Sequence, residues 1–275
     1  MNIQARTHHR AAQLAAAVAL VLLVFSTAGC DRLKARDQLN KGIRAYKMAQ
    51  YTQAAEFFKT ACALDPKLPV ARLYLATAYA QQFIPGAESE ENMKMGERAV
   101  EEFKKVLVDE PNNANSVAGI ASIYFNMKRL EDAKTWYQKQ IQIDPSNPEA
   151  YYSIGVIGWS QTYPERMKVK AEHNIQQEAP IKDPKVREPL CAKNTPIIED
   201  AFTHLNKAVE LRPDYDDAMA YINLMYREKA DCAADPEERN QLNKVADTWV
   251  DKLMEVKRKK AEAASKSGGG LVTGQ

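Results

Sequence analysis

The chain has 275 residues, 45% hydrophobic and 27% charged, a globular composition that excludes a disordered chain or a polytopic membrane protein. Its formal net charge is +2, and both surplus charges, Arg6 and Arg10, lie in the first 29 residues. Residues 30–275 are therefore neutral overall, which disfavours nucleic-acid binding because that class usually carries a clear basic excess.

Residues 1–29 have the three-part pattern of a secretory signal. A polar and basic start is followed by an almost wholly apolar run over residues 11–25, and small residues then lead to Cys30. The apolar run is short for a membrane-spanning helix. We therefore expect residues 1–29 to be a signal peptide and the remaining chain to be exported.

Thr27-Ala28-Gly29-Cys30 resembles a bacterial lipobox, in which a small pair precedes a cysteine that is acylated and becomes the mature N-terminus. Thr27 departs from that family, which usually has Leu there. The resemblance implies a lipoprotein with palmitate-type acylation at Cys30, where two or more acyl chains give stable anchoring. Residues 30–34 would then be a short linker beside the membrane. Cleavage after Ala28 is the alternative and would release a soluble periplasmic protein.

The body of the chain is repetitive. Four segments have similar ends before Pro66, Pro111, Pro145 and Pro213, and the spacings are 45, 34 and 68 residues. These correspond to one 34-residue period with eleven extra residues, to one period and to two periods. The third repeat has the most regular apolar stripe, which is Val117, Ile120, Ala121 and Tyr124.

A 34-residue period that ends in proline resembles the tetratricopeptide repeat (TPR). The resemblance depends on small and large side chains at fixed offsets within each repeat. In the third repeat these residues are Ile120, Ala121, Tyr124, Ala133, Tyr137 and Pro145. The resemblance covers about residues 35–260. It implies an all-α fold, a right-handed α-solenoid of antiparallel helix hairpins over residues 35–262. Because no hairpin buries its apolar face alone, we expect one cooperative array.

Helix starts are predicted at Asn147-Pro148 and Asp235-Pro236, where a capping residue precedes proline. The second repeat carries an excess around residues 83–92, which predicts an extended hairpin. The fourth repeat carries 34 extra residues, 163–196, with five prolines. We expect a short amphipathic helix over 164–178 and no regular helix over 179–196. This insert is either a functional or mobile loop or a crossover packed on the array. Residues 263–275 are expected to be a disordered tail.

No catalytic, metal-binding or cofactor-binding pattern is present. None of the four histidines has a partner at metal-ligand spacing, and no phosphate-binding loop or nucleophile motif occurs. We expect no cofactor, no metal and no enzymatic activity. Cys191 and Cys232 form a possible disulfide in an exported compartment, although sequence alone does not establish the distance between them.

The TPR resemblance also implies a partner-binding groove, which in that family is lined by the first helix of each hairpin. The positions carried over are Tyr46, Leu73, Thr77, Gln81, Asn115, Ser122, Phe125, Asn126, Tyr152, Val156, Trp159 and Arg227. The basic clamp for a C-terminal carboxylate is absent, because Leu39 and Ile43 occupy its positions. The aromatic and amide-rich remainder suits a segment with apolar anchors. Packing of these side chains between hairpins is the alternative.

We therefore expect a non-catalytic interaction scaffold, anchored in a Gram-negative-type envelope and facing the periplasm. Its partners would be other envelope proteins, bound through the groove, and the membrane, bound through lipid on Cys30. Phe125, Tyr152 and Trp159 lie on consecutive first helices, so the partner is expected across the third and fourth repeats. The alternatives are an assembly factor of the pilotin or outer-membrane-insertion type and an unrecognised envelope enzyme that uses the insert. The choice between inner and outer membrane stays open.

Overall fold

The computed structural model describes residues 30–268, and all regular secondary structure in that range is helical. The expected all-α class is confirmed. The predicted signal peptide and residues 269–275 lie outside the described residues. After a first helix over residues 30–47, the helices are α2 (Tyr51–Leu64), α3 (Pro69–Gln82), α4 (Glu90–Asp109), α5 (Ala114–Asn126), α6 (Leu130–Ile143), α7 (Pro148–Glu172), α8 (Pro184–Leu211), α9 (Asp216–Cys232) and α10 (Pro236–Gly268).

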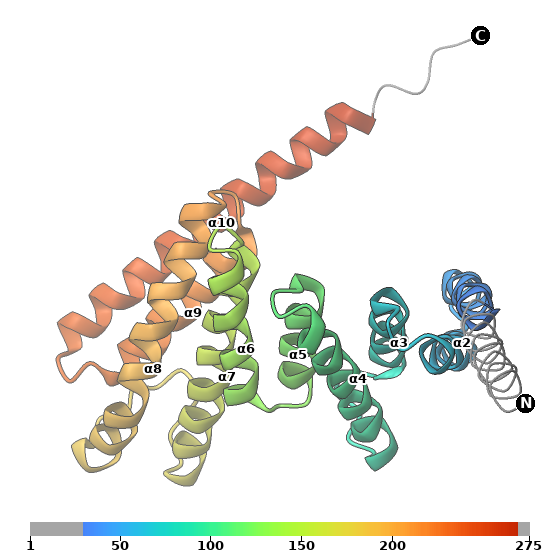
Figure 1. Ribbon diagram of the computed structural model, residues 1–275. Helices are drawn as coiled ribbons and strands as arrows, with labels where there is room; N and C mark the ends of the chain where they lie inside the picture. The colour runs from blue at the N-terminus through green and yellow to red at the C-terminus, as the bar shows by residue number, and fades with distance from the viewer. Residues whose placement is uncertain (1–29, 269–275) are drawn as a thin grey trace, which may run out of the picture. The chain divides into compact units, whose positions relative to one another are not determined.

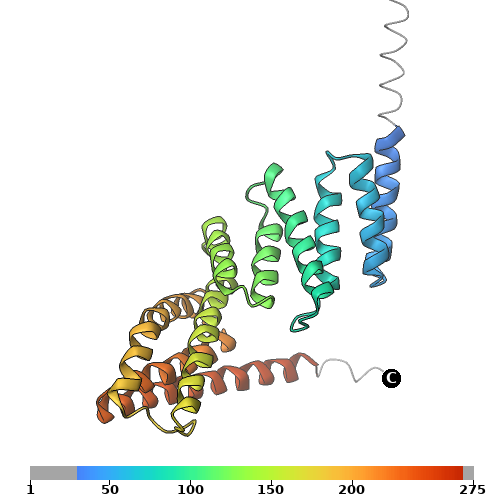
Figure 2. The same cartoon turned by 90° about the horizontal axis from the view of Figure 1, so that it is seen from below.

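The helices divide into two compact units, and the division falls between Met127 and Lys128. Unit 1 contains the helix over residues 30–47 and α2 to α5, and unit 2 contains α6 to α10 (Figures 1 and 2). The boundary lies inside the third predicted repeat, between its two helices. The division between the two compact units therefore falls within a predicted repeat and not between two repeats.

Both predicted capping sites are confirmed. The Asn147 side chain accepts a hydrogen bond from the Glu149 amide at 2.9 Å, and Pro148 follows it as the first helical residue. Asp235 accepts from the Glu237 amide at 3.0 Å in the same way. These side chains satisfy amides that have no partner inside the helix, so each helix begins where the sequence predicts.

Small residues let the two helices of a hairpin approach closely. A Cβ atom on Gly42 would lie 2.4 Å from the Phe58 ring, and one on Gly155 would lie 2.3 Å from Leu205 Cγ. Both distances are far below van der Waals contact. The repeat positions occupied by glycine are therefore contact points where the partner helix fills the space of a side chain.

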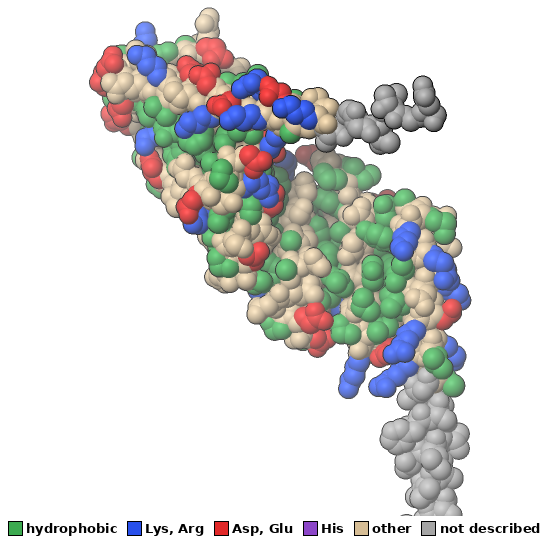
Figure 3. Space-filling view, turned by 90° about the horizontal axis from the view of Figure 1, so that it is seen from above, with side chains coloured by type: hydrophobic (Ala, Val, Ile, Leu, Met, Phe, Trp, Pro, Cys, Tyr) green, Lys and Arg blue, Asp and Glu red, His purple; other side chains and the backbone are tan. Residues whose placement is uncertain are grey.

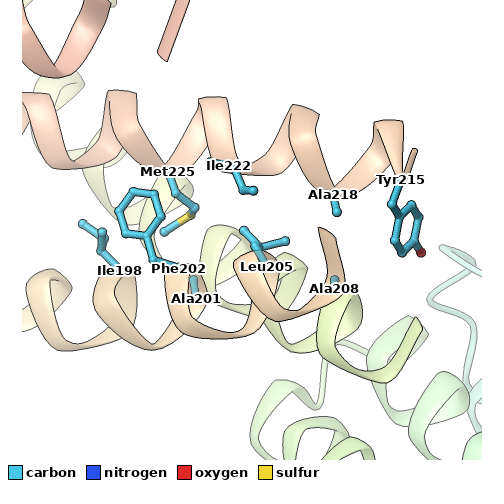
Figure 4. Close-up of a cluster of buried hydrophobic side chains, with 9 residues drawn as sticks. All are labelled: Ile198, Ala201, Phe202, Leu205, Ala208, Tyr215, Ala218, Ile222 and Met225. Atoms are coloured by element: carbon cyan, nitrogen blue, oxygen red, sulfur yellow. The ribbon is translucent and has the colours of Figure 1, made fainter. Parts of the chain in front are cut away.

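The core of unit 2 lies between α8 and α9. Side chains from these two antiparallel helices point toward one another (Figure 4). The buried set is Ile198, Ala201, Phe202, Leu205, Ala208, Tyr215, Ala218, Ile222 and Met225. Several aromatic side chains of α7 and α9 pack against this cluster. The core therefore supports the surface on which the candidate site is built.

Residues 163–196 do not form a separate insert. Residues 163–172 continue α7 through Pro164, and residues 184–196 are the first half of α8. Only the connection between the two helices is non-helical or turn-like. The predictions of a separate helix over 164–178 and of irregular backbone over 179–196 are therefore wrong, because the extra residues lengthen the fourth hairpin.

The helix α8 contains three prolines, and their positions explain why the helix is not broken. Pro184 is the first helical residue and follows the Asp183 cap, so its missing amide costs nothing there. Pro189 and Pro196 are both exposed. They are seven residues apart, which places them on one side of the helix. The backbone carbonyls that lose a partner thus face water, while Leu190 and Ile198 are buried.

Both ends of the described chain are more helical than predicted. Residues 30–34 belong to the first helix and are not a linker. At the other end α10 continues to Gly268, so residues 263–268 are helical although a disordered tail was expected. The last part of α10 projects past the other helices of unit 2 (Figure 2), and acidic and basic side chains cover it (Figure 3). Within residues 30–268, no helix is both long and apolar enough to cross a bilayer.

Candidate functional site

A row of aromatic side chains runs along α7 and α9, the first helices of the last two hairpins. Tyr152 and Trp159 of α7 both meet the ring of Tyr221 edge-on, each at a centroid distance of 5.6 Å. Trp159 also stacks on Tyr163 at 4.8 Å, and Tyr152 contacts Tyr215 at 5.0 Å. The two helices are in contact, so the row forms one continuous surface.

At one end of this row, Glu149 accepts hydrogen bonds from the Tyr215 hydroxyl and from Arg212 Nη1, the second at 2.7 Å. Burial opposes ionisation of Glu149, but the two hydrogen bonds prevail and its pKa lies below the ordinary value. Burial raises the pKa of Tyr152 and of Tyr221, so both hydroxyls stay protonated at neutral pH. At this end of the row, the Glu149 carboxylate, the Tyr215 hydroxyl and the Arg212 guanidinium therefore have hydrogen-bond partners within the protein.

The other end of the row opens into a cavity of about 440 Å³. Trp159, Tyr163 and Leu224 form its apolar wall. The remaining lining residues are Arg166, Lys170, Gln177, Glu178, Pro180, Arg227, Glu228, Ala230, Asp231, Arg239 and Asn243. The extended part of α7, the connection to α8, α9 and the start of α10 therefore converge on this cavity.

The floor of the cavity is a buried ion-pair cluster of four residues: Arg166, Lys170, Glu228 and Asp231. The Arg166 guanidinium binds Glu228 through two nitrogens, each at 2.9 Å, and also donates to Asp231. Lys170 Nζ lies 2.6 Å from Asp231 and donates to the Gln177 carbonyl at 2.9 Å. Lys170 is 1% exposed and Glu228 is 2% exposed. Because buried charges must be paired, the cluster holds two cations against two carboxylates.

Burial lowers the pKa of Arg166, but Glu228 and Asp231 outweigh that effect and the pKa lies above its ordinary value. Burial raises the pKa of Glu228, and Arg166 opposes the shift. Arg166 therefore stays charged, and its two acidic partners hold it in one orientation. The cluster fixes the extended end of α7 on the end of α9 and gives the cavity a rigid floor.

Cys191 and Cys232 are joined by a disulfide, with their Cα atoms 5.5 Å apart and a sequence separation of 41. The sequence singled out the same pair. Cys232 follows Asp231 directly, so the bond ties α8 to the part of α9 that carries half of the ion-pair cluster. The other described cysteines, Cys30 and Cys62, are free, and burial raises the pKa of the Cys62 thiol.

Two of the four groove residues predicted in unit 2 line the cavity. Trp159 belongs to its wall and Arg227 to its rim, where Arg227 is paired with Asp247 at 2.8 Å. Tyr152 lies farther along the aromatic row. Val156 is only 8% exposed, so it is a packing residue and not part of an open surface. Of the residues predicted to line the groove in unit 2, some line the cavity and one packs in the interior.

The eight groove residues predicted in unit 1 form no comparable site. Gln81, Asn115 and Ser122 are exposed, while Tyr46, Leu73, Thr77, Phe125 and Asn126 are partly buried. Two of them are engaged within their own helix, because Thr77 donates to the Leu73 carbonyl and Asn126 donates to the Ser122 carbonyl. A cavity of about 370 Å³ in unit 1 lies among α2, α3 and α4, and none of the eight lines it.

Sequence reasoning missed the ion-pair cluster and Arg239. In the segment expected to form an amphipathic helix, the cation Lys170 is buried and its apolar neighbour Ala171 is exposed. The available pattern was a pair of cations four residues apart on α7 and a pair of acids three residues apart on α9. Such pairs are usually solvated, and only the packing of α7 on α9 brings these four together.

The chemistry of the site is that of recognition. An apolar wall, a neutralised floor and a charged rim can hold a side chain and orient it. Within residues 30–268, no three His, Cys, Asp or Glu side chains are arranged to hold a metal ion. His204 Nδ1 lies 2.8 Å from the Asp200 carbonyl of its own helix, and His173 lies at the C-terminal end of α7.

Comparison with known proteins agrees with the repeat pattern. A family profile described as TPR repeat matches residues 121–161. A crystal structure of MamA protein is similar to this chain, with a TM-score of 0.58 and 16% sequence identity. The alignment covers 88% of this chain and 98% of the MamA chain. The structure of MamA from Desulfovibrio magneticus RS-1 is similar as well, with a TM-score of 0.56 and 18% sequence identity. That alignment covers 82% of this chain and 96% of the MamA chain. No curated protein sequence matches significantly. The TPR-type α-solenoid fold expected from the sequence is confirmed.

Proposed function

We propose that this chain is a non-catalytic scaffold that binds a segment of a partner protein along the aromatic row and in the cavity of unit 2. The observation that carries the proposal is the convergence of Trp159, Tyr163 and Arg227 on one cavity at the end of that row. Large aromatic side chains and arginine dominate the binding energy at protein interfaces. A rigid floor reduces the entropy that binding would otherwise cost.

The fold supports the same proposal. Stacked helix hairpins present the first helices on one surface, and such extended surfaces suit peptide segments. The row and the cavity are open to solvent at side chains that are only partly buried, including Trp159 and Tyr221. An apolar anchor on the partner would desolvate these rings and gain most of the affinity there.

We further propose that the chain is exported and anchored to a membrane by lipid on Cys30, so that its partners are other envelope proteins. The sequence pattern of residues 1–30 supports export, and the exposed position of Cys30 is compatible with acylation. The disulfide between Cys191 and Cys232 fits an oxidising compartment, where such bonds persist.

Site-specific photocrosslinking in cells tests the proposal. A photoreactive residue at Asn243, which lines the cavity, should yield a crosslinked partner. The same probe at Thr203, which is exposed on α8 and lies outside the cavity lining, is the control. Trp159→Ala should weaken the crosslink at Asn243, because loss of a hot-spot side chain costs roughly 2 kcal/mol or more of binding free energy.

Trp159 also packs against the core cluster, so its substitution affects stability as well as binding. The matched control is Trp136→Ala, since Trp136 is a partly buried tryptophan of α6 in the same unit and does not line the cavity. Equal loss of the crosslink in both variants would attribute it to destabilisation. Crosslinks from Thr203 but none from Asn243 would contradict the proposed site.

A further inference from the structure

Arg239 is the one cation of the cavity lining that has no ionic partner among the described residues. Arg166 and Lys170 are paired with Glu228 and Asp231, and Arg227 is paired with Asp247. No described carboxylate forms an ion pair with Arg239, although its side chain lines the cavity and is partly buried. Its charge is therefore available to a ligand.

The position of Arg239 strengthens its effect inside the cavity. Arg239 is the fourth residue of α10, and the two acidic residues of the same turn, Glu237 and Glu238, are exposed and do not line the cavity. A partly buried charge is also screened less by salt than an exposed one. Glu178 is the other charged lining residue without an ionic partner among the described residues, but its side chain is exposed on the connection between α7 and α8. The unbalanced charge that a buried ligand meets is thus positive.

An apolar wall lies in the same cavity as this charge. Trp159 stacks on Tyr163, and Leu224 completes the wall. A volume of about 440 Å³ is at the small end of ligand pockets, which range over roughly 300–1,000 Å³. The cavity therefore accommodates one or two side chains of a segment and not a whole helix.

We propose that the cavity recognises an aromatic residue that is next to an aspartate or glutamate in the partner segment. The aromatic ring packs on Trp159 and Tyr163, and the carboxylate pairs with Arg239. This inference rests on the proposed function, because the occupant is the partner segment itself. The bound carboxylate would supply the ionic partner that Arg239 lacks, in a charge-assisted hydrogen bond.

Three capped dipeptides test this specificity on the mature chain. The probes are acetyl-Phe-Asp-amide, the isosteric neutral acetyl-Phe-Asn-amide and the cationic acetyl-Phe-Lys-amide, with dissociation constants measured by NMR titration. We expect the Asp peptide to bind about tenfold more tightly than the Asn peptide, because one hydrogen bond to a charged group contributes a free energy of that size. The Lys peptide should bind most weakly.

Variants assign the effect to named residues. Arg239→Gln should abolish the difference between the Asp and Asn peptides, and Arg239→Lys should retain part of it. Arg258→Gln is the matched control, because Arg258 lies on the same helix, is exposed and is paired with Glu262. Since Arg239 has no partner to lose, the melting temperature of Arg239→Gln should equal that of the unmodified protein.

The outcomes separate the inference from the proposed function. If the Asp and Asn peptides bind equally well and Trp159→Ala abolishes the binding of both, the charge preference is overturned. The proposed function, binding of a partner segment in the cavity, would still stand. Preference for the Lys peptide, abolished by Glu178→Gln, would show a cation site and overturn the inference. Binding that Trp159→Ala does not change would place the occupant elsewhere and contradict the proposed function. Absence of binding of all three peptides at millimolar concentration would also overturn the inference.

Discussion

Removal of the disulfide should destabilise unit 2 strongly. Cys191 and Cys232 are 41 residues apart, and a cross-link of that length lowers the entropy of the unfolded chain by an amount worth about 4 kcal/mol at 25 °C. This figure is large against the roughly 5–15 kcal/mol of stability that is usual for a folded domain. The variant Cys191→Ser/Cys232→Ser should therefore unfold at a much lower denaturant concentration than the unmodified protein.

Tryptophan fluorescence follows this transition without interference from unit 1. The chain has three tryptophans, Trp136, Trp159 and Trp249, and all of them lie in unit 2. The fluorescence change on unfolding thus reports on the unit that contains the disulfide. Cys62→Ser, in unit 1, is the control and should leave the midpoint of this transition unchanged.

Two results would refute the reasoning. One is an unchanged fluorescence midpoint in the double variant under oxidising conditions, which would mean that the bond does not restrict the unfolded chain. The other is full labelling of Cys191 and Cys232 by a thiol reagent, without reductant, in protein isolated under thiol-blocking conditions. Protection of this pair together with labelling of Cys62 is the expected pattern.

Three further predictions concern anchoring, packing and acid sensitivity. Cys30→Ala should release the protein from membranes in cell fractionation, and sedimentation after a high-salt wash would show that lipid on Cys30 is not the anchor. Gly155→Ala should lower the free energy of unfolding by about 1–3 kcal/mol in denaturant titrations, because its Cβ would overlap Leu205; an unchanged midpoint would contradict the close contact. The folded pKa of Glu149 lies below the unfolded value of about 4.3, so its stabilisation is complete above that pH and is lost as pH falls through the folded pKa. Glu149→Gln should remove this part of the acid sensitivity of unfolding, and an identical pH profile in the variant would refute the assignment.

The repeat pattern predicted most of the helices because it is a local signal. Caps at Asn147 and Asp235, and a proline just after each, place helix starts within a few residues. Small side chains at fixed offsets in the repeat are consistent with the close helix contacts found at Gly42 and Gly155. These features depend on neighbours in sequence or on one adjacent helix, so a 34-residue period is enough to find them.

The irregular parts of the chain depend on contacts that a period does not encode. Pro189 and Pro196 read as helix breakers when each is considered alone, yet their spacing puts both on the solvent side of α8. The pairing of Arg166 with Glu228 spans 62 residues and joins α7 to α9. Only the packing of α7 on α9 makes this pair. Part of the candidate site was therefore visible from sequence as Trp159, while its charged lining was not.

The buried ion-pair cluster restricts how this protein can change during evolution. Loss of one member would leave a buried charge without a partner, at a cost of about 3–5 kcal/mol. Replacement of all four members by apolar side chains of similar volume can be neutral or even stabilising. Single substitutions at positions 166, 170, 228 and 231 are thus selected against, while a joint replacement is permitted. Homologues should keep the four charges together or lose them together, and these positions should covary in an alignment.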